Sequence, residues 1–208
     1  MKNTLIYVHD PMCSWCWGFE SVRRRLFDAL GDRVDIRRLV GGLAPDSQEP
    51  MDLAMQASLQ QTWQRIEQVI PGTSFNYAFW SDCAPRRSTY PANRAVIAAR
   101  HQGDEFDEAM TARIQQAYYR EARNPSDDGT LIKLAADIGL DPDLFSESLK
   151  SAQTQQLLLD EIHSARSMGM NSFPSLAIEQ GGELSQVMVN YTDMEAMLRQ
   201  IEDLTTQN

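Results

Sequence analysis

The chain has 208 residues, of which 42% are hydrophobic and 23% charged, and these proportions are typical of a globular protein with a buried core. Its formal net charge of −10 argues against nucleic acid as a partner, because phosphate binding requires clustered lysine and arginine. The dense basic run at residues 23–25 is therefore predicted to be a solvated helix face. No apolar run reaches the length of a membrane span, so we expect no membrane partner either.

Cysteine usage and the N-terminal residues bear on the cellular compartment. Three cysteines are too few, and odd in number, for the disulfide framework of a secreted protein. Residues 1–11 contain one lysine and a short mixed apolar run, without the apolar core or cleavage site of a signal peptide. The sequence therefore predicts a cytoplasmic protein.

The first 44 residues predict a βαβ unit. Residues 4–8 and 34–40 are β-rich apolar runs, and the second of them is closed by two glycines. Between them, apolar residues spaced by three and four predict a helix that ends near Gly31: Phe19, Val22, Leu26 and Leu30. Cys13 and Cys16 fall at the junction between the first strand and this helix.

Residues 45–150 have a helical pattern, interrupted by an irregular, aromatic-rich segment at residues 71–91. One helix is predicted around an apolar stripe formed by Met55, Leu59, Trp63, Ile66 and Ile70. Two more are predicted within residues 92–100 and 106–119, and another around Leu131, Leu134, Ala135 and Ile138. Gly139 is predicted to end the last of these helices, and Asp141 followed by Pro142 to begin the next.

The C-terminal part returns to β structure after a long helix that runs toward Gly169. Residues 175–179 and 184–190 predict a hairpin around two glycines, and Thr192 with Glu195 predicts a capping box for a closing helix. The element order is therefore βαβ, a helical block, and ββα. It predicts an α/β domain formed by residues 1–44 and 151–208, interrupted by an inserted helical domain at residues 45–150.

The two N-terminal cysteines form a C-x-x-C motif with Ser14 and Trp15 between them. The thiolate is the reactive form of cysteine, and the unsatisfied N–H groups and dipole at a helix N-terminus stabilise it at Cys13. Cys16 lies about one helical turn further on, where its sulfur can approach that of Cys13. This pattern favours a redox-active dithiol in which Cys13 attacks and Cys16 resolves.

A metal site and inert burial are the alternatives for the cysteine pair. A structural zinc site needs four ligands, and the remaining Cys83 and the three histidines show no paired ligand spacing, so no metal is expected. Two inert buried thiols are less consistent with a strand–helix junction. Pro174, which directly precedes the hairpin, adds support to the redox dithiol, because an X-Pro bond can adopt the cis form cheaply and hold a turn beside it.

These motifs resemble those of the DsbA-like thioredoxin-fold oxidoreductases, especially the cytosolic FrnE-like branch. The resemblance rests on Cys13-Ser14-Trp15-Cys16 after the first strand, the helical insertion, and Phe173-Pro174 before the hairpin. It implies a thioredoxin fold interrupted by a helical domain, with Cys13 as nucleophile and Cys16 as resolving thiol. It also implies that Pro174 is the cis-proline facing the dithiol and that Phe173 lends backbone to a bound substrate.

The chain departs from the family pattern at three places. Many thioredoxin-fold enzymes carry a buried acid six residues before the first cysteine, where this chain has Tyr7. Strongly oxidising members have a histidine between the cysteines, so Ser14 and Trp15 are expected to tune the redox properties here. Phe173 replaces the small β-branched residue common before the cis-proline, and with Trp15 it is expected to influence substrate choice.

Several further residues have both a functional and a structural interpretation. Cys83 is either an auxiliary thiol activated by Arg86 and Arg87, which would lower its pKa, or a lone half-buried cysteine. His9 and Asp10 either relay protons or form a turn. A set of aromatic residues either lines an apolar client groove or belongs to the core: Trp15, Trp17, Phe19, Phe79 and Trp80.

The leading function is a thiol–disulfide oxidoreductase or isomerase that exchanges disulfides with protein clients or small-molecule thiols. No cofactor is expected, although glutathione is a candidate redox partner. An alternative is a glutathione-dependent transferase or isomerase of small molecules, of the kappa-class or hydroxychromene-carboxylate isomerase type. Those relatives usually keep a single activating serine, which the intact cysteine pair argues against. A third alternative is a non-catalytic binding or chaperone module.

Overall fold

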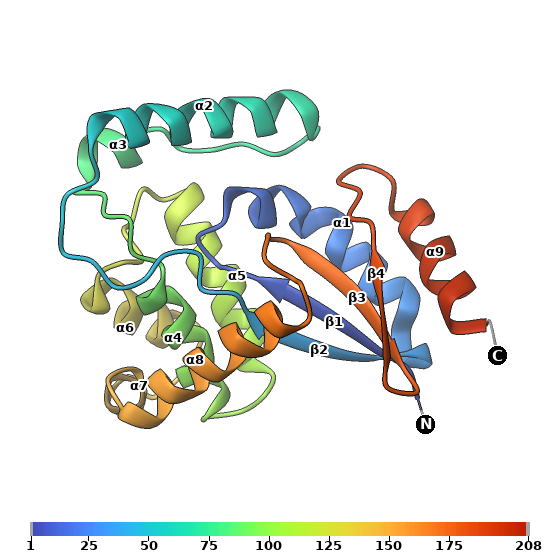
Figure 1. The fold of residues 1–208 in the computed structure, drawn as a ribbon. Helices are drawn as coiled ribbons and strands as arrows, with labels where there is room; N and C mark the ends of the chain where they lie inside the picture. The colour runs from blue at the N-terminus through green and yellow to red at the C-terminus, as the bar shows by residue number, and fades with distance from the viewer. Residues whose placement is uncertain (1, 207–208) are drawn as a thin grey trace.

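The computed structural model describes residues 2–206, which form a four-stranded mixed sheet and its surrounding helices (Figure 1). The strands are β1 (Thr4–His9), β2 (Asp35–Val40), β3 (Ser175–Gln180) and β4 (Glu183–Val187), in the spatial order β2-β1-β3-β4. β1 is parallel to β2 and antiparallel to β3, which pairs antiparallel with β4. The predicted βαβ and ββα units therefore share one sheet, as a thioredoxin fold requires.

Both faces of the central strand β1 are buried, which explains its continuous apolar sequence. Successive side chains of a strand point to opposite faces. Leu5 and Tyr7 accordingly pack in one core with helices α1 (Ser14–Leu30) and α9 (Met194–Thr206). Ile6 and Val8 pack in another core that includes Ala165 of α8 (Ala152–Ser167).

Helices α2 to α7 occupy the chain between β2 and α8 and lie mainly to one side of the sheet, with α2 and α3 forming a separate upper layer (Figure 1). Their bounds are α2 Leu53–Val69, α3 Phe79–Asp82, α4 Tyr90–Arg100, α5 Phe106–Tyr119, α6 Asp128–Asp137 and α7 Pro142–Leu149. Trp63 is fully buried in their core. Leu158 and Ile162 of α8 join this core, so α8 packs on both the helices and the sheet. The division into two domains stays a prediction.

Most predicted helix ends are confirmed, and one cap is corrected. Gly31 follows α1, Ile138 and Gly139 follow α6, and the Asp141 side chain accepts hydrogen bonds at the start of α7. The predicted Thr192–Glu195 capping box is wrong, because Asp193 caps α9 by accepting a 3.0 Å hydrogen bond from the Ala196 N–H. Between residues 2 and 206, no helix has the length and apolar character needed to cross a membrane.

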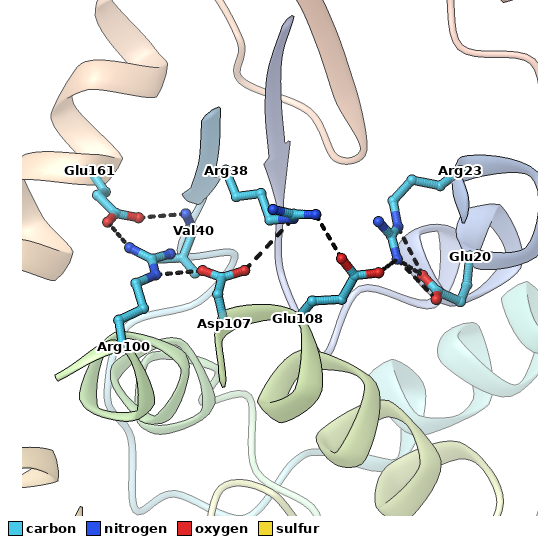
Figure 2. Close-up of polar contacts among 8 residues, drawn as sticks. All are labelled: Glu20, Arg23, Arg38, Val40, Arg100, Asp107, Glu108 and Glu161. Atoms are coloured by element: carbon cyan, nitrogen blue, oxygen red, sulfur yellow. Dashed lines mark hydrogen bonds and ion pairs between the residues drawn. The ribbon is translucent and has the colours of Figure 1, made fainter. Parts of the chain in front are cut away.

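A chain of alternating charges ties the helical block to the sheet (Figure 2). Glu108 of α5 pairs with Arg23 of α1 at 2.9 Å and with Arg38 of β2 at 2.6 Å. Further along, Asp107 and Glu161 both pair with Arg100, and Glu161 also accepts a 2.7 Å hydrogen bond from the Val40 N–H.

The ion-pair chain overturns part of the prediction for residues 23–25. Arg24 and Arg25 are exposed, as expected for a solvated helix face. Arg23 is instead buried, with its side chain 5% exposed, because two carboxylates neutralise its guanidinium: Glu20 at 2.8 Å and Glu108. The free-energy cost of removing a charged group from water is offset when that group is paired and hydrogen-bonded in this way.

Candidate functional site

Cys13 occupies the N-cap position of α1, at the end of the loop that follows β1. Its backbone is extended, with φ −81° and ψ 116°, while its carbonyl accepts the first helical hydrogen bond, from the Trp17 N–H at 3.1 Å. The sulfur therefore lies at the positive end of the helix dipole, which stabilises a thiolate. The predicted position of Cys13 at the strand–helix junction is confirmed.

The second half of the site is the turn before β3. The Phe173–Pro174 peptide bond is cis, as predicted. The Cys13 thiol donates a 3.4 Å hydrogen bond to the carbonyl oxygen of Phe173. Antiparallel pairing of β1 with β3 explains this meeting, because Val8 lies opposite Ser175 and the loops beyond them share one edge of the sheet.

Cys16 is fully buried on the first turn of α1. Burial raises its pKa well above the ordinary thiol value, and the hydrogen bond and charge of Cys13 raise it further. Both cysteines carry free thiols. The pair thus combines a thiol at a helix N-terminus with an inner thiol that resists ionisation.

A buried carboxylate, Asp10, anchors the loop that carries the cysteines. Its backbone carbonyl accepts a 3.0 Å hydrogen bond from the Cys13 N–H, and its side chain accepts one of 2.8 Å from the Met12 N–H. It also accepts hydrogen bonds of 2.7 Å from the Leu43 N–H and the Thr89 hydroxyl and of 2.8 Å from the Asn93 amide. Burial raises the pKa of Asp10, and these hydrogen bonds offset part of the rise.

Asp10 is a buried acid close to the dithiol, whereas Tyr7 stands at the position where many thioredoxin-fold enzymes carry their buried acid. The charge and the backbone of Asp10 both act on Cys16, so the two groups are close neighbours. Tyr7 faces the same region from β1, but burial raises its pKa well above 10 and keeps the phenol neutral. The sequence placed Asp10 only in a turn or a proton relay, and its partners on distant helices carry no local sequence signal.

His9 stacks on Tyr7, with ring centroids 4.9 Å apart. Burial lowers the pKa of His9 to about 3, and the nearby Arg23 lowers it as well, so the imidazole is neutral at physiological pH. His9 therefore contributes a neutral aromatic ring to the packing below the dithiol loop.

The two residues between the cysteines lie in different surroundings. Ser14 is buried, and its hydroxyl accepts a 2.9 Å hydrogen bond from the Trp63 indole N–H. Trp15 is half-buried and packs against Tyr191, with ring centroids 5.1 Å apart. Ser14 is thus held by the helical core, whereas Trp15 belongs to the surface around the site.

A cavity of about 350 Å³ opens beside Cys13. Its lining includes Trp15, Phe173, Leu59 of α2 and Arg87. A larger hollow of about 610 Å³ lies between α1, the end of α2 and Tyr191, but neither cysteine lines it. Because Cys13 lines it, the smaller cavity is the candidate substrate site.

Gly41 supports the Phe173 turn and was not identified as a site residue from the sequence. A Cβ atom at Gly41 would lie 2.2 Å from the Phe173 ring. Phe173 therefore packs its ring against a position that only glycine can occupy, while its carbonyl faces Cys13. The pair of glycines after β2 was the only available signal.

The other candidate residues lie in the core or pack against it. Cys83 is half-buried, and its thiol donates a 3.0 Å hydrogen bond to the Ala122 carbonyl. Of its two interpretations, the lone half-buried cysteine is supported, because burial and the charges of Asp127 and Asp82 raise its pKa instead of the arginines lowering it. Phe19 and Phe79 are core residues, and Trp17 and Trp80 pack on the helical core. Across residues 2–206, no group of three or more His, Cys, Asp and Glu side chains could hold a metal ion.

The fold and the site define a thioredoxin-fold protein with a C-x-x-C dithiol at the N-terminus of its first helix. A family model described as "Thioredoxin" matches residues 6–198, and the chain belongs to this family. The expected DsbA-like thioredoxin fold is therefore confirmed.

Two solved structures share this fold over the whole chain. A putative protein disulfide isomerase from Nitrosomonas europaea has a TM-score of 0.88 at 25% identity, with 100% of both chains covered. The cytosolic disulfide reductase DsbM from Pseudomonas aeruginosa has a TM-score of 0.79 at 24% identity, covering 99% of this chain and 100% of that one.

Curated relatives match at lower coverage. The ClpXP adapter protein SpxH from Halalkalibacterium halodurans is 24% identical over 176 residues, which cover 80% of this chain and 55% of that protein. The chain spans about half the length of the SpxH relatives that it matches.

Proposed function

We propose that this protein is a thiol–disulfide oxidoreductase that uses Cys13 and Cys16. The Cys13 thiolate attacks one sulfur of a substrate disulfide, whose S–S bond breaks and releases one thiolate. The Cys16 thiolate then attacks the Cys13 sulfur of the mixed disulfide and releases the second thiolate. The protein ends as a Cys13–Cys16 disulfide, and the substrate ends as two thiols.

One observation carries this proposal. Cys13 is at the N-cap of α1, and its sulfur lies 3.4 Å from the carbonyl of the residue before a cis-proline. The helix end favours the attacking thiolate, and the Phe173–Pro174 turn offers backbone beside it for an extended substrate. Trp15, Phe173 and Pro174 are the proposed substrate contacts.

The different environments of the two thiols support their separate roles. Burial raises the pKa of Cys16, and the hydrogen bond and charge of Cys13 raise it further, so the free enzyme holds Cys16 protonated. Formation of a mixed disulfide removes the charge on Cys13, and with it the contribution of that charge to the raised pKa of Cys16. Cys16 thus becomes easier to ionise at the stage where its attack is needed.

The direction of exchange and its partners extend this proposal. The structurally similar DsbM has been solved with GSH, which favours glutathione as a redox partner here too. DsbM is described as cytosolic and as a disulfide reductase, and both properties are proposed for this chain together with reduction of protein disulfides. In a reducing cytoplasm the pair would stay reduced and act as a reductase or isomerase.

Serine variants of the cysteines test the proposed function. Cys13→Ser is expected to abolish reduction of a disulfide substrate, because no nucleophile remains at the N-cap. Cys16→Ser is expected to capture substrate as a mixed disulfide on Cys13 that mass spectrometry detects and dithiothreitol reverses. Cys83→Ser, whose thiol is engaged with Ala122, is the matched control and should retain activity.

The same variants separate the alternatives. A glutathione-dependent transferase or isomerase would turn over its conjugate without Cys16, because it needs only one activating group. An adapter or binding module, the role named for SpxH, would keep its client binding in Cys13→Ser. Full disulfide reduction by Cys13→Ser would contradict the proposed function.

A further inference from the structure

The cavity beside Cys13 has an uneven distribution of charge. Two arginines, Arg86 and Arg87, contribute to its lining, and among the described residues that line it there is no aspartate or glutamate. The chain as a whole has a net charge of −10. The substrate cavity is therefore locally basic in an otherwise acidic protein.

The two arginines differ in how their charges are satisfied. Arg86 pairs with Asp127 at 2.5 Å and donates a 2.9 Å hydrogen bond to the Ser126 carbonyl. Its charge is thus neutralised by Asp127, which does not line the cavity. Arg87 is half-buried, and within residues 2–206 no carboxylate forms an ion pair with it. Its guanidinium is available to an incoming ligand.

We propose that Arg87 binds a carboxylate of the substrate, so that the preferred substrates are small disulfides bearing a carboxylate near the reacting sulfur. This inference rests on the proposed thiol–disulfide exchange and names its substrate class. A guanidinium suits the task, because its planar set of donors matches the two oxygens of a carboxylate. The cavity volume of about 350 Å³ is at the lower end of the range typical of small-molecule sites.

The reaction step is unchanged by this contact. Cys13 attacks the disulfide sulfur that lies next to the bound carboxylate, the S–S bond breaks, and the distal half leaves as a thiolate. Cys16 then displaces the proximal half. Arg87 acts by holding the proximal half and by offsetting the repulsion between an anionic substrate and the thiolate of Cys13.

A pair of disulfides matched in size isolates the effect of the carboxylate. The pre-reduced protein would be mixed with dithiodipropionate, which carries two carboxylates, or with dithiodipropionamide, the diamide of the same acid, which is neutral. Each single-turnover rate constant would be divided by the rate constant for reduction of the same disulfide by dithiothreitol. This division corrects for the intrinsic reactivity of each disulfide. We expect a normalised preference for the dicarboxylate of about fivefold or more that falls with added salt.

Arginine variants assign the preference to one residue. Arg87→Gln should lower the ratio of dicarboxylate to neutral rate toward one, and Arg87→Lys should retain part of it. Arg37→Gln, which removes an exposed charge on β2 outside the cavity, is the matched control and should keep the wild-type ratio. Far-ultraviolet circular dichroism would verify that each variant is folded.

The outcomes distinguish the two levels of the proposal. A wild-type protein that reduces neither disulfide would contradict the proposed thiol–disulfide exchange itself. A protein that reduces both, with a ratio equal in wild type and Arg87→Gln, would overturn the role of Arg87 and leave the exchange chemistry standing. A ratio that falls equally in Arg37→Gln would also overturn it, because the effect would then come from overall charge.

Discussion

At the scale of single residues, the burial of Cys16 determines how the dithiol depends on pH. Its pKa is raised first by burial, and burial persists after Cys13 has formed a mixed disulfide. Below that raised pKa, the thiolate fraction grows about tenfold for each pH unit. We therefore expect the second, resolving phase of disulfide reduction to accelerate with pH across the neutral and alkaline range.

Stopped-flow detection of the two released thiols measures this dependence directly. The first release reports capture by Cys13 and the second reports attack by Cys16. Cys16→Ser, which should show only the first release, identifies the phases. A second phase whose rate is the same at about pH 7 and about pH 9 would contradict the high pKa of Cys16.

Asp10 supports a prediction about stability. Four donors converge on its two carboxylate oxygens, and all of them are buried or partly buried. Asp10→Asn would place an NH₂ group against some of these donors, and we expect a loss of about 2–4 kcal/mol in the free energy of unfolding. Thr89→Val removes one of these donors and also the acceptor of the buried Ala44 N–H, and it should cost about 1–3 kcal/mol. Urea unfolding curves that superimpose for wild type and Asp10→Asn would rule out this anchoring role.

At the scale of elements, the end of β2 supports the turn before β3. Gly41→Ala would drive a methyl group into the Phe173 ring, which must then move together with the carbonyl facing Cys13. We expect the variant to fold with a loss of about 1–3 kcal/mol, the range for overpacked cores, and to reduce disulfides more slowly. The ratio of rates with wild type measures the second effect.

Gly18→Ala is a useful comparison for this variant. A Cβ atom there would meet the end of the Ile70 side chain at 2.7 Å, away from the Phe173 turn. It should also cost stability but leave the rate of disulfide reduction close to that of wild type. Equal rate losses in both variants would point to general destabilisation rather than to displacement of Phe173.

Elements with strong local patterns were predictable from the sequence. The apolar runs of β1 and β3, the three-and-four spacing in α1 and the helical pattern of residues 106–119 predicted those elements at or close to their observed bounds. The cap of α9 was misplaced by one residue, because Thr192 and Asp193 are both good N-cap residues and only the structure shows which one accepts the bond.

The site was only partly predictable for a physical reason. Cys13, Cys16 and Pro174 carry motif signals, whereas Asp10, Gly41 and Arg23 depend on partners that the fold brings from far along the chain. Asp10 accepts from Asn93, which is 83 residues away, and Arg23 pairs with Glu108, which is 85 residues away. Such contacts leave no periodicity or spacing in the sequence.

At the scale of the whole molecule, Glu108 links α5 to both β2 and α1 (Figure 2). Burial alone would raise its pKa, but Arg23 and Arg38 lower it overall. Because the folded-state pKa is depressed, this stabilisation is present above the unfolded value of about 4.3 and is lost as the pH falls through the folded value.

Glu108→Gln tests this link. Its side chain is 43% exposed, so solvent screening reduces the expected loss at neutral pH to about 1–2 kcal/mol in the free energy of unfolding. The difference from wild type should shrink in acid, at about pH 3, where Glu108 itself becomes protonated. Glu202→Gln, which breaks the exposed pair with Arg33, should cost less than about 1 kcal/mol. A larger effect for Glu202→Gln would contradict the structural importance of the ion pairs of Glu108 with Arg23 and Arg38.

The separation of 160 residues between Cys13 and Phe173 has a consequence for biosynthesis. A ribosome delivers the N-terminal segment first, so Cys13 emerges well before Thr89 and Asn93, which anchor its loop, and long before β3. Until β3 pairs with β1, the nascent thiols have neither the turn that faces them nor the cavity beside them. The proposed disulfide exchange thus becomes possible only after β3 has been synthesised, and a chain stalled before β3 would expose two ordinary cysteines.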